Sequence, residues 1–360
     1  MRKVAARCTI VSTAPALALV ALGSPALADE DPSGWGAVQE ASDQASGQKD
    51  GKRYSASAGQ VSLKGDAQGQ EGSARGGGNL SVPAANWEPP PCWYAPKYTP
   101  KELKKEVDAS PYELTGQRPD NGRKKEDVDG SIRDKYTKGD YKNFNLKKQG
   151  DGMFWAAVPN PNEPDKAKAQ SCTELPFWVK NGEQPDVPGA IDTKILAALA
   201  YQAIEVPDTE VELNPKNKQT VRLPTWTWLD KATFKPVSVT ASVDLGGGEE
   251  LSATTTAKPG ALNLDPGTED AKLHPASGKC PAKESGTIGT PYTKGNAKKT
   301  PPCGLTYLRS TPKGETYTLQ ASVVWEAAWK GSDGTSDTLP DGTFGNEQPV
   351  TVQEVQSINR

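Results

Sequence analysis

The 360-residue chain has a single histidine, His274, and only two methionines. One histidine cannot build a metal site with several imidazole ligands, and it leaves little room for catalysis that depends on histidine. The sequence also has no run of about 18 apolar residues, so we expect no membrane span in the mature protein. Glycine and proline, at 35 and 31 residues, together make up 18% of the chain. Their combined usage in ordinary proteins is about 12%, so the excess predicts extensive linkers and turns.

Motifs for nucleotide binding are missing as well. Each G-x-G pair, at 34/36, 76/78, 150/152 and 246/248, lacks the third glycine of the dinucleotide-binding G-x-G-x-x-G pattern. Gly246 ends a predicted strand but is followed by Glu249 and Glu250, which would repel a pyrophosphate. The chain has neither a P-loop nor the G-x-S-x-G turn of serine hydrolases. We therefore expect no nucleotide and no other cofactor, and we expect a protein that is not an enzyme.

Calcium is the metal for which the sequence offers partial patterns. Residues 126–130 resemble part of a D-x-D-x-D-G loop, but Lys125 occupies the position of the first ligand. Asp333, Asp337 and Asp341 lie in a predicted hairpin and could gather oxygen ligands. Solvated turn residues are the simpler interpretation, so we expect no metal site.

Residues 1–28 have the pattern of an export signal. Arg2, Lys3 and Arg7 precede an apolar run at 14–22, and Ala-Leu-Ala at 26–28 forms a small-residue cleavage pattern. Cleavage would remove three basic residues from a chain of net charge −3, which leaves −6. We expect a secreted, extracellular protein, and its negative charge argues against nucleic acid as a partner.

The mature chain keeps four cysteines, Cys92, Cys172, Cys280 and Cys303. Three connectivities are possible, and the grouping favours Cys92–Cys172 and Cys280–Cys303. In the chain-entropy model each bridge contributes about 3–5 kcal/mol to stability. A four-thiolate zinc site is the alternative, but no C-x-x-C pair is present and an oxidising compartment favours disulfides.

Composition divides the mature chain into four parts. Residues 29–85 are rich in Gly, Ser, Ala and Gln without apolar periodicity, which predicts a disordered tether. Residues 86–190 form a Cys/Trp/Pro-rich stretch, predicted to be a small, disulfide-stapled, loop-rich α+β subdomain. Apolar residues at three- and four-residue steps predict a connector helix within 191–205. Residues 206–360 alternate apolar and polar residues, which predicts an antiparallel β-sandwich and a mainly β fold.

Two strands carry the clearest alternation. One is predicted over 237–243, and it ends at the glycine turn 246–248. The other is predicted over 316–329, where Trp325 and Trp329 share one face with Leu319 and Val323. Burial of that face in the core is the preferred interpretation of these two tryptophans.

Several segments resemble known families. Residues 262–268 are similar to the Trp-Asp-x-Gly-Asp-Gly turn of domains of the polycystic-kidney-disease (PKD) type, with Leu264 in place of the Trp. Residues 304–307 and 317–323 resemble the closing strand pair of those domains, which implies an Ig-like C-terminal sandwich. Residues 89–94, 223–230 and 352–356 resemble a group of secreted actinobacterial (Streptomyces-like) proteins without an established activity. Neither resemblance implies catalytic residues.

Trp226 and Trp228 are the candidate binding residues. They lie two apart on a predicted strand, so both side chains point to one face, where exposed rings could stack on sugars. Burial in the core is the preferred interpretation of this pair too, and exposure is the alternative that would make it a binding surface. We predict a non-enzymatic binding or structural module of the cell surface whose partner is an envelope protein or a cell-wall glycan. Glycan binding through exposed tryptophans and a hydrolase that uses two of the 45 acidic residues are the alternatives.

Overall fold

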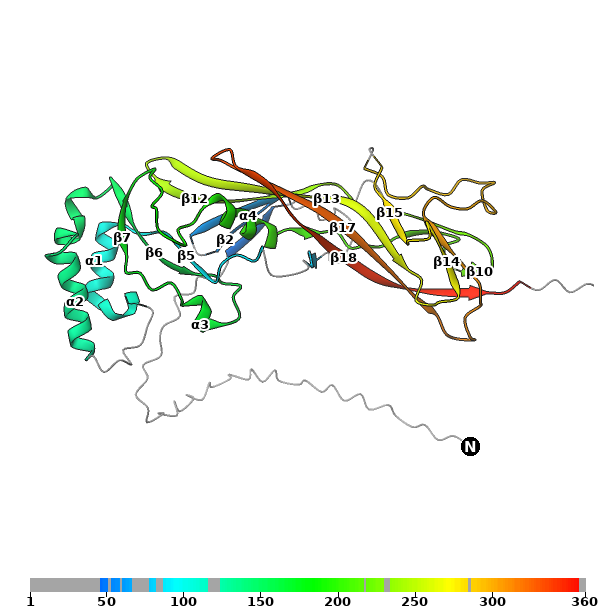
Figure 1. Cartoon of the computed structure of the whole chain (residues 1–360), viewed down its shortest axis with the longest axis horizontal. Coiled ribbons are helices and arrows are strands. Elements are labelled where there is room, and N and C mark those ends of the chain that lie inside the picture. Colours follow the sequence, from blue (N-terminus) through cyan, green and yellow to red (C-terminus); the bar gives the residue numbers. More distant parts are fainter. Residues whose placement is uncertain are drawn as a thin grey trace, which may run out of the picture. The chain divides into compact units, whose positions relative to one another are not determined.

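The computed structural model describes residues 46–50, 53–58, 60–66, 78–81, 87–115, 124–216, 218–229, 234–283 and 286–355. Within these ranges the chain is mainly β, with four sheets and several short helices (Figure 1). The expected signal peptide, residues 1–28, lies outside the described residues. None of the helices described is both long and apolar enough to cross a bilayer.

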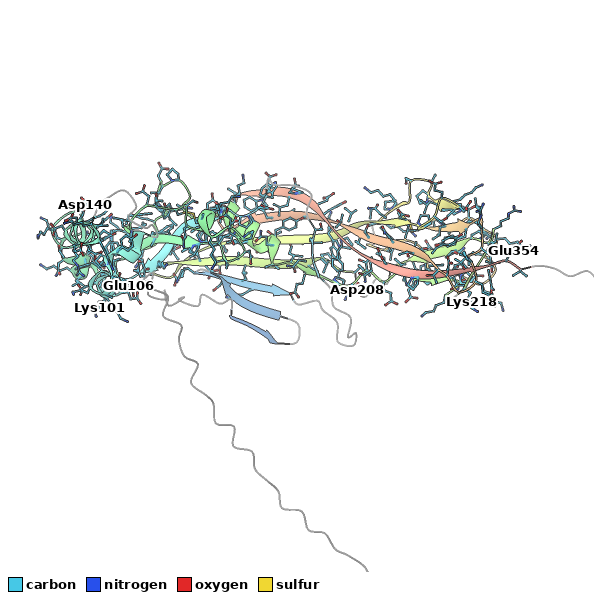
Figure 2. All side chains as sticks on the ribbon, turned by 90° about the horizontal axis from the view of Figure 1, so that it is seen from below. Lys101, Glu106, Asp140, Asp208, Lys218 and Glu354 are labelled. Carbon is cyan, nitrogen blue, oxygen red and sulfur yellow. A yellow bond between two sulfur atoms is a disulfide. The ribbon has the colours of Figure 1, made fainter. Side chains whose placement is uncertain are left out.

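The largest sheet curls into a half-barrel. Neighbouring strands run antiparallel, except that β10 pairs with β18 in parallel. Figure 2 shows Lys218 of β10 near Glu354, which follows β18. The strand order is β1 (Ser46–Asp50), β2 (Arg53–Ala58), β3 (Val61–Asp66), β12 (Val237–Gly246), β13 (Glu249–Asp265), β17 (Tyr317–Gly331), β18 (Ser336–Gln353) and β10 (Lys218–Thr220), while β15 (Lys279–Pro281) also pairs with β13.

The predicted alternation is realised in β12 and β17. Each presents its apolar residues to the core, and Val239, Val323 and Trp325 are completely buried. On the other face of β12, Ser238 and Thr240 form hydroxyl hydrogen bonds to Thr256 and Thr254 of β13, at 2.8 and 2.7 Å. Both predicted strands are therefore confirmed.

Helix α4 (Thr193–Gln202) packs against β12, β13 and β17. The Asp192 carboxylate caps it by accepting a hydrogen bond from the Ile195 N–H at 2.7 Å. Thr255 of β13 donates to the Ala197 carbonyl at 2.9 Å. All residues from Leu196 to Tyr201 are buried, so the helix is enclosed on several sides instead of burying the single face that was expected.

A four-stranded sheet, β14-β16-β11-β9, contributes to the same core. Its buried Leu305 and Tyr307 join Leu262 and Leu319 of the large sheet in one apolar cluster. The Tyr307 ring stacks on Tyr317 at 5.3 Å between centroids. The strands are β9 (Glu212–Asn214), β11 (Thr225–Trp228), β14 (Ala271–His274) and β16 (Gly304–Tyr307).

A three-stranded sheet lies in the Cys/Trp/Pro-rich stretch: β5 (Cys92–Tyr98), β6 (Gly152–Pro159) and β7 (Phe177–Lys180). Its buried Trp93 and Trp155 belong to the main core, so this stretch packs on its neighbour as expected. Both disulfides favoured by the sequence are formed, Cys92–Cys172 and Cys280–Cys303. A further short pair joins β4 (Gly78–Asn79) to β8 (Glu205–Val206).

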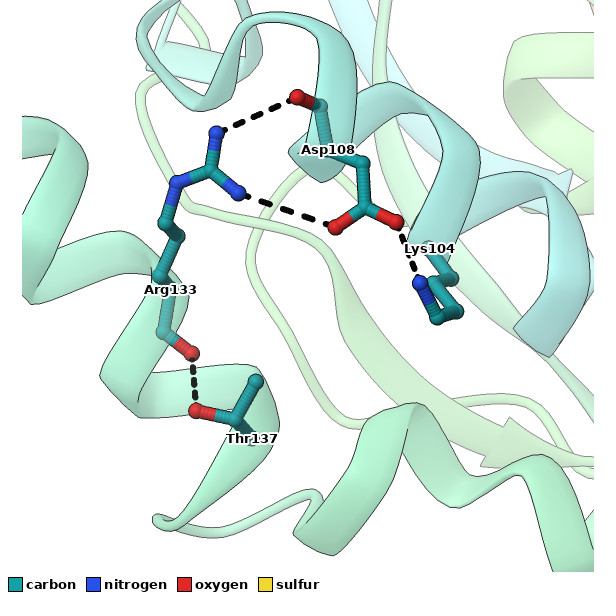
Figure 3. Close-up of polar contacts among 4 residues, drawn as sticks. All are labelled: Lys104, Asp108, Arg133 and Thr137. Carbon is teal, nitrogen blue, oxygen red and sulfur yellow. Dashed lines mark hydrogen bonds and ion pairs between the residues drawn. The ribbon is translucent and has the colours of Figure 1, made fainter.

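Helices cover the remainder of this stretch: α1 (Pro100–Ala109), η1 (Pro111–Thr115), α2 (Lys125–Thr137), η2 (Lys142–Lys148) and α3 (Lys166–Ala169). They enclose a second apolar cluster that includes Leu103, Ile132 and Tyr136. Figure 3 shows how α1 and α2 are joined: the Arg133 guanidinium donates to the Asp108 carbonyl at 3.2 Å and lies 3.6 Å from its carboxylate, which also pairs with Lys104. Thr137 donates to the Arg133 carbonyl.

Three expectations differ from this architecture. Part of the predicted disordered tether forms β1 to β4, and β3 pairs with β12 with Val61 fully buried. The loop-rich subdomain holds more helix than expected, because α2 was not predicted. The predicted sandwich over 206–360 is seen only in part, since the β12 half of the large sheet packs against α4 and against β5 and β6, which all precede residue 206.

Candidate functional site

Strand β11 has two different faces. Thr225 and Thr227 are buried with their side chains on the core side, where Thr225 donates to the Gln219 side chain at 2.7 Å. Trp226 and Trp228 point the other way, as the two-residue spacing predicts. Trp226 is only 6% exposed and lies outside the main apolar cluster, while Trp228 is half-buried. Another part of the chain therefore covers the outer face of the strand.

The cover is the segment 281–302, which is closed at its base by the Cys280–Cys303 disulfide. We call this segment the disulfide loop. Two backbone hydrogen bonds tie it to β11 and the residue after that strand: the Thr227 N–H donates to the carbonyl of Cys303, which closes the loop, at 3.0 Å, and the Leu229 N–H donates to the Ile288 carbonyl within the loop at 3.1 Å. Ile288 is itself buried, at 2% exposure. The loop is thus held against the strand by backbone hydrogen bonds and a buried side chain, while the disulfide joins its two ends.

Gly289 allows the closest approach between loop and strand. Its φ of +77° is unfavourable for other residues, and a Cβ there would lie 2.4 Å from the Thr227 carbonyl oxygen. Farther along, the Tyr292 ring meets Trp226 edge to face at 6.0 Å between centroids. The indole N–H of Trp226 is buried and has no acceptor among the described residues.

The tip of the disulfide loop is built from consecutive turns. The Asn296 side chain donates to Thr293 Oγ1 at 2.6 Å, and the Lys299 N–H donates to the Asn296 carbonyl at 2.9 Å. These turns hold Lys294, Lys298 and Lys299 in exposed positions. None of the three forms an ion pair within the described part of the chain.

Trp226 and Trp228 do not form an exposed pair of rings, because Tyr292 packs against Trp226, which is 6% exposed. Trp325 and Trp329 lie in the core at 0 and 7% exposure, as preferred from the sequence. Sugar stacking on both rings of the Trp226 and Trp228 pair would require the disulfide loop to move away. The outer face of β11 is therefore a covered surface whose accessible part is the loop.

His274 lies at the end of β14, where its Nε2 is 3.0 Å from Thr306 Oγ1 of β16. Partial burial, and next the positive charge of Lys272, lower the pKa of this histidine. The imidazole is therefore neutral at pH 7 and pairs with a hydroxyl across two strands. This arrangement supports a structural role.

The two partial calcium patterns do not form a site. Residues 126–130 lie in α2, so they cannot adopt a calcium-binding loop. Asp333 lies in the turn between β17 and β18, where it accepts hydrogen bonds from Thr193 and Thr335. Across the ranges that the structure describes, no three His, Cys, Asp or Glu side chains are close enough together to hold a metal ion.

One pocket of about 190 Å³ lies beside the Cys92–Cys172 disulfide. Ala156, Ala157 and Leu114 line it, together with Gln170. Small-molecule sites usually measure roughly 300–1,000 Å³, so this pocket is smaller than an ordinary ligand site.

Sequence reasoning found the tryptophan pair and the disulfide but missed the lysine-bearing loop between the two cysteines. The available signal was its charge, since residues 281–302 contain four lysines and one glutamate in a chain that is negative overall. No protein-family model, curated protein or solved structure matches the chain.

Proposed function

We propose that the protein is a secreted, non-enzymatic binding or structural module of the cell surface, with an Ig-like sandwich that presents loops to another envelope component. The strand order carries this proposal. The small sheet runs β9-β11-β16-β14, and the large sheet contains β13-β17-β18. With the seven strands named A to G in chain order, these sequences read A-B-E-D and C-F-G, the arrangement of Ig constant-type domains.

A tyrosine at the start of the sixth strand gives further support. Tyr317 begins β17, and its hydroxyl donates to the Ser310 carbonyl, seven residues upstream, at 3.4 Å. Ig-like domains have a tyrosine corner at the same place. The chain departs from antibody domains because its Cys280–Cys303 bridge joins β15 to the residue before β16, instead of joining strands B and F.

Secretion rests on the signal pattern and on the cysteines. Two disulfides persist only in oxidising compartments of ordinary cells, and both pairs here are bonded. A rigid scaffold with a loop fixed over β11 favours binding to a partner, because a loop held on a rigid framework loses less conformational entropy when it binds.

The test is secretion followed by retention on cell envelopes. The full chain, expressed in its own host, should appear outside the cell beginning at Asp29, with all four cysteines resistant to a thiol reagent. The purified protein should then sediment with isolated envelopes. A cytosolic product with reduced cysteines would contradict the proposal, and so would turnover of envelope material that one Asp→Asn or Glu→Gln change abolishes.

A further inference from the structure

The disulfide loop carries a net positive charge in a chain that is negative overall. Residues 281–302 carry Lys283, Lys294, Lys298 and Lys299 against Glu284, a net charge of +3, whereas the entire chain has a net charge of −3. The Lys283 ammonium donates to Thr290 within the loop at 2.8 Å. The other three lysines are exposed on the loop tip, so their charges face solvent together.

The loop is fixed in place before any partner arrives. The Cys280–Cys303 bridge, the hydrogen bonds from Thr227 and Leu229, and the contact between Tyr292 and Trp226 hold its base. Turns order its tip. Lysines on an ordered loop attract a polyanion more strongly than lysines on a mobile segment, because little loop entropy is lost on binding.

Aromatic groups lie beside these charges. Tyr292 and Trp228 are both half-buried, so part of each side chain reaches the surface. Aromatic faces pack against the apolar faces of sugar rings, so the accessible part of Tyr292 can contact a sugar.

We propose that the disulfide loop binds a polyanionic glycan, whose carboxylate or phosphate groups pair with Lys294, Lys298 and Lys299 while a sugar ring packs against Tyr292. This inference rests on the proposed function and assigns the chemistry of the partner. It differs from stacking on an exposed tryptophan pair, because the lysines supply the attraction. Binding is therefore weakened by salt, since the loop charges are exposed.

The experiment measures binding of the mature chain to immobilised polygalacturonate, phosphorylated dextran and unmodified dextran. We expect binding to at least one charged glycan at low salt, and none to unmodified dextran. The variant Lys294→Gln/Lys298→Gln/Lys299→Gln should bind the charged glycan more weakly by a factor of about ten or more. The matched control Lys101→Gln/Lys105→Gln/Lys142→Gln removes three exposed lysines from α1 and η2 and should change affinity by less than about twofold.

Other outcomes would overturn the inference. They are binding to neither charged glycan, equal losses in both triple variants, or tighter binding to polyglutamate or duplex DNA than to the glycans. Tyr292→Leu should weaken binding to the glycan but not to polyglutamate. An equal effect on both would contradict the proposed contact between Tyr292 and a sugar ring. If glycan binding fails while envelope retention persists, only this inference fails. Loss of retention itself would count against the proposed function.

Discussion

Trp325 tests how a single side chain stabilises the core. It is fully buried, with the ring of Phe234 at 6.4 Å, and its indole N–H has no partner among the described residues. Trp325→Ala should lower the free energy of unfolding by about 3–5 kcal/mol because it leaves a large cavity. Trp325→Phe should cost less than about 1.5 kcal/mol, because it also removes a buried unpaired donor.

Chemical denaturation of the two variants measures the difference. Equal costs for Trp325→Phe and Trp325→Ala would mean that the indole N–H is satisfied in the folded protein. The environment of Trp325 would then need revision, while the strand assignment of β17 would stand on its alternation of buried residues.

Gly289 tests the contact between the disulfide loop and β11. Gly289→Ala should destabilise the protein by more than about 1 kcal/mol, because the new Cβ meets the Thr227 carbonyl oxygen and the backbone has a positive φ. Gly295→Ala is the matched control, since Gly295 also has a positive φ but faces open space. Thermal unfolding compares them, and the prediction is wrong if Gly295→Ala is equally destabilising.

The turn between β17 and β18 holds α4 in position. The Asp333 carboxylate accepts hydrogen bonds from Thr193 at 2.9 Å and from the Thr335 hydroxyl and N–H at 2.6 and 2.9 Å. The bonds from Thr335, and then that from Thr193, lower the pKa of Asp333 below its ordinary value of 3.8. Folding therefore gains stability from the ionised form above pH 3.8, and this gain is lost as the pH falls through the lowered pKa.

Asp333→Asn should accordingly lower the free energy of unfolding at pH 7 by a few tenths to about 1 kcal/mol, because the site is exposed to solvent. The difference from the natural protein should shrink as the pH is lowered below 3.8. Urea unfolding at several pH values measures it. Asp337→Asn, in the same hairpin, is the control because, within the part of the chain that the structure describes, its carboxylate bonds only to the next residue, Thr338. A penalty that stays constant down to pH 2 would contradict the assignment.

The secondary-structure elements differ in how far the sequence reveals them. Strands β12 and β17 are predictable because their alternation is uninterrupted. Strand β13 is harder to recognise over its full length because a bulge between Pro259 and Ala261 breaks its two-residue period. Helix α2 escapes prediction because its apolar positions, including Ile132 and Tyr136, are diluted by charged residues.

The candidate site divides in the same way. The direction of Trp226 and Trp228 follows from the two-residue period of a strand. Their burial does not, because Tyr292, far along the chain, supplies the cover. Strands β1 and β2 have almost no apolar residues to signal them, and the alternation of Val61 and Leu63 in β3 is too short to predict a strand by itself.

Strand β3 determines whether the long edge of β12 is protected. Residues 62–65 of β3 pair with 239–242 of β12. Without β3, the edge of β12 would expose unpaired backbone groups along residues 239–242, within the uncharged stretch 237–243. Such an edge pairs readily with a second chain.

We therefore compare two truncated chains, one beginning at residue 60 and one at residue 67. The longer keeps β3, a short edge strand with the exposed Lys64, which discourages pairing. It should scatter light like the mature protein, whereas the shorter should self-associate as its concentration rises. A Thr240→Lys change in the shorter chain should reverse the association by placing a charge on the exposed edge. If both truncated chains behave alike, β3 does not protect β12, and the N-terminal strands contribute nothing to keeping the sheet from self-association.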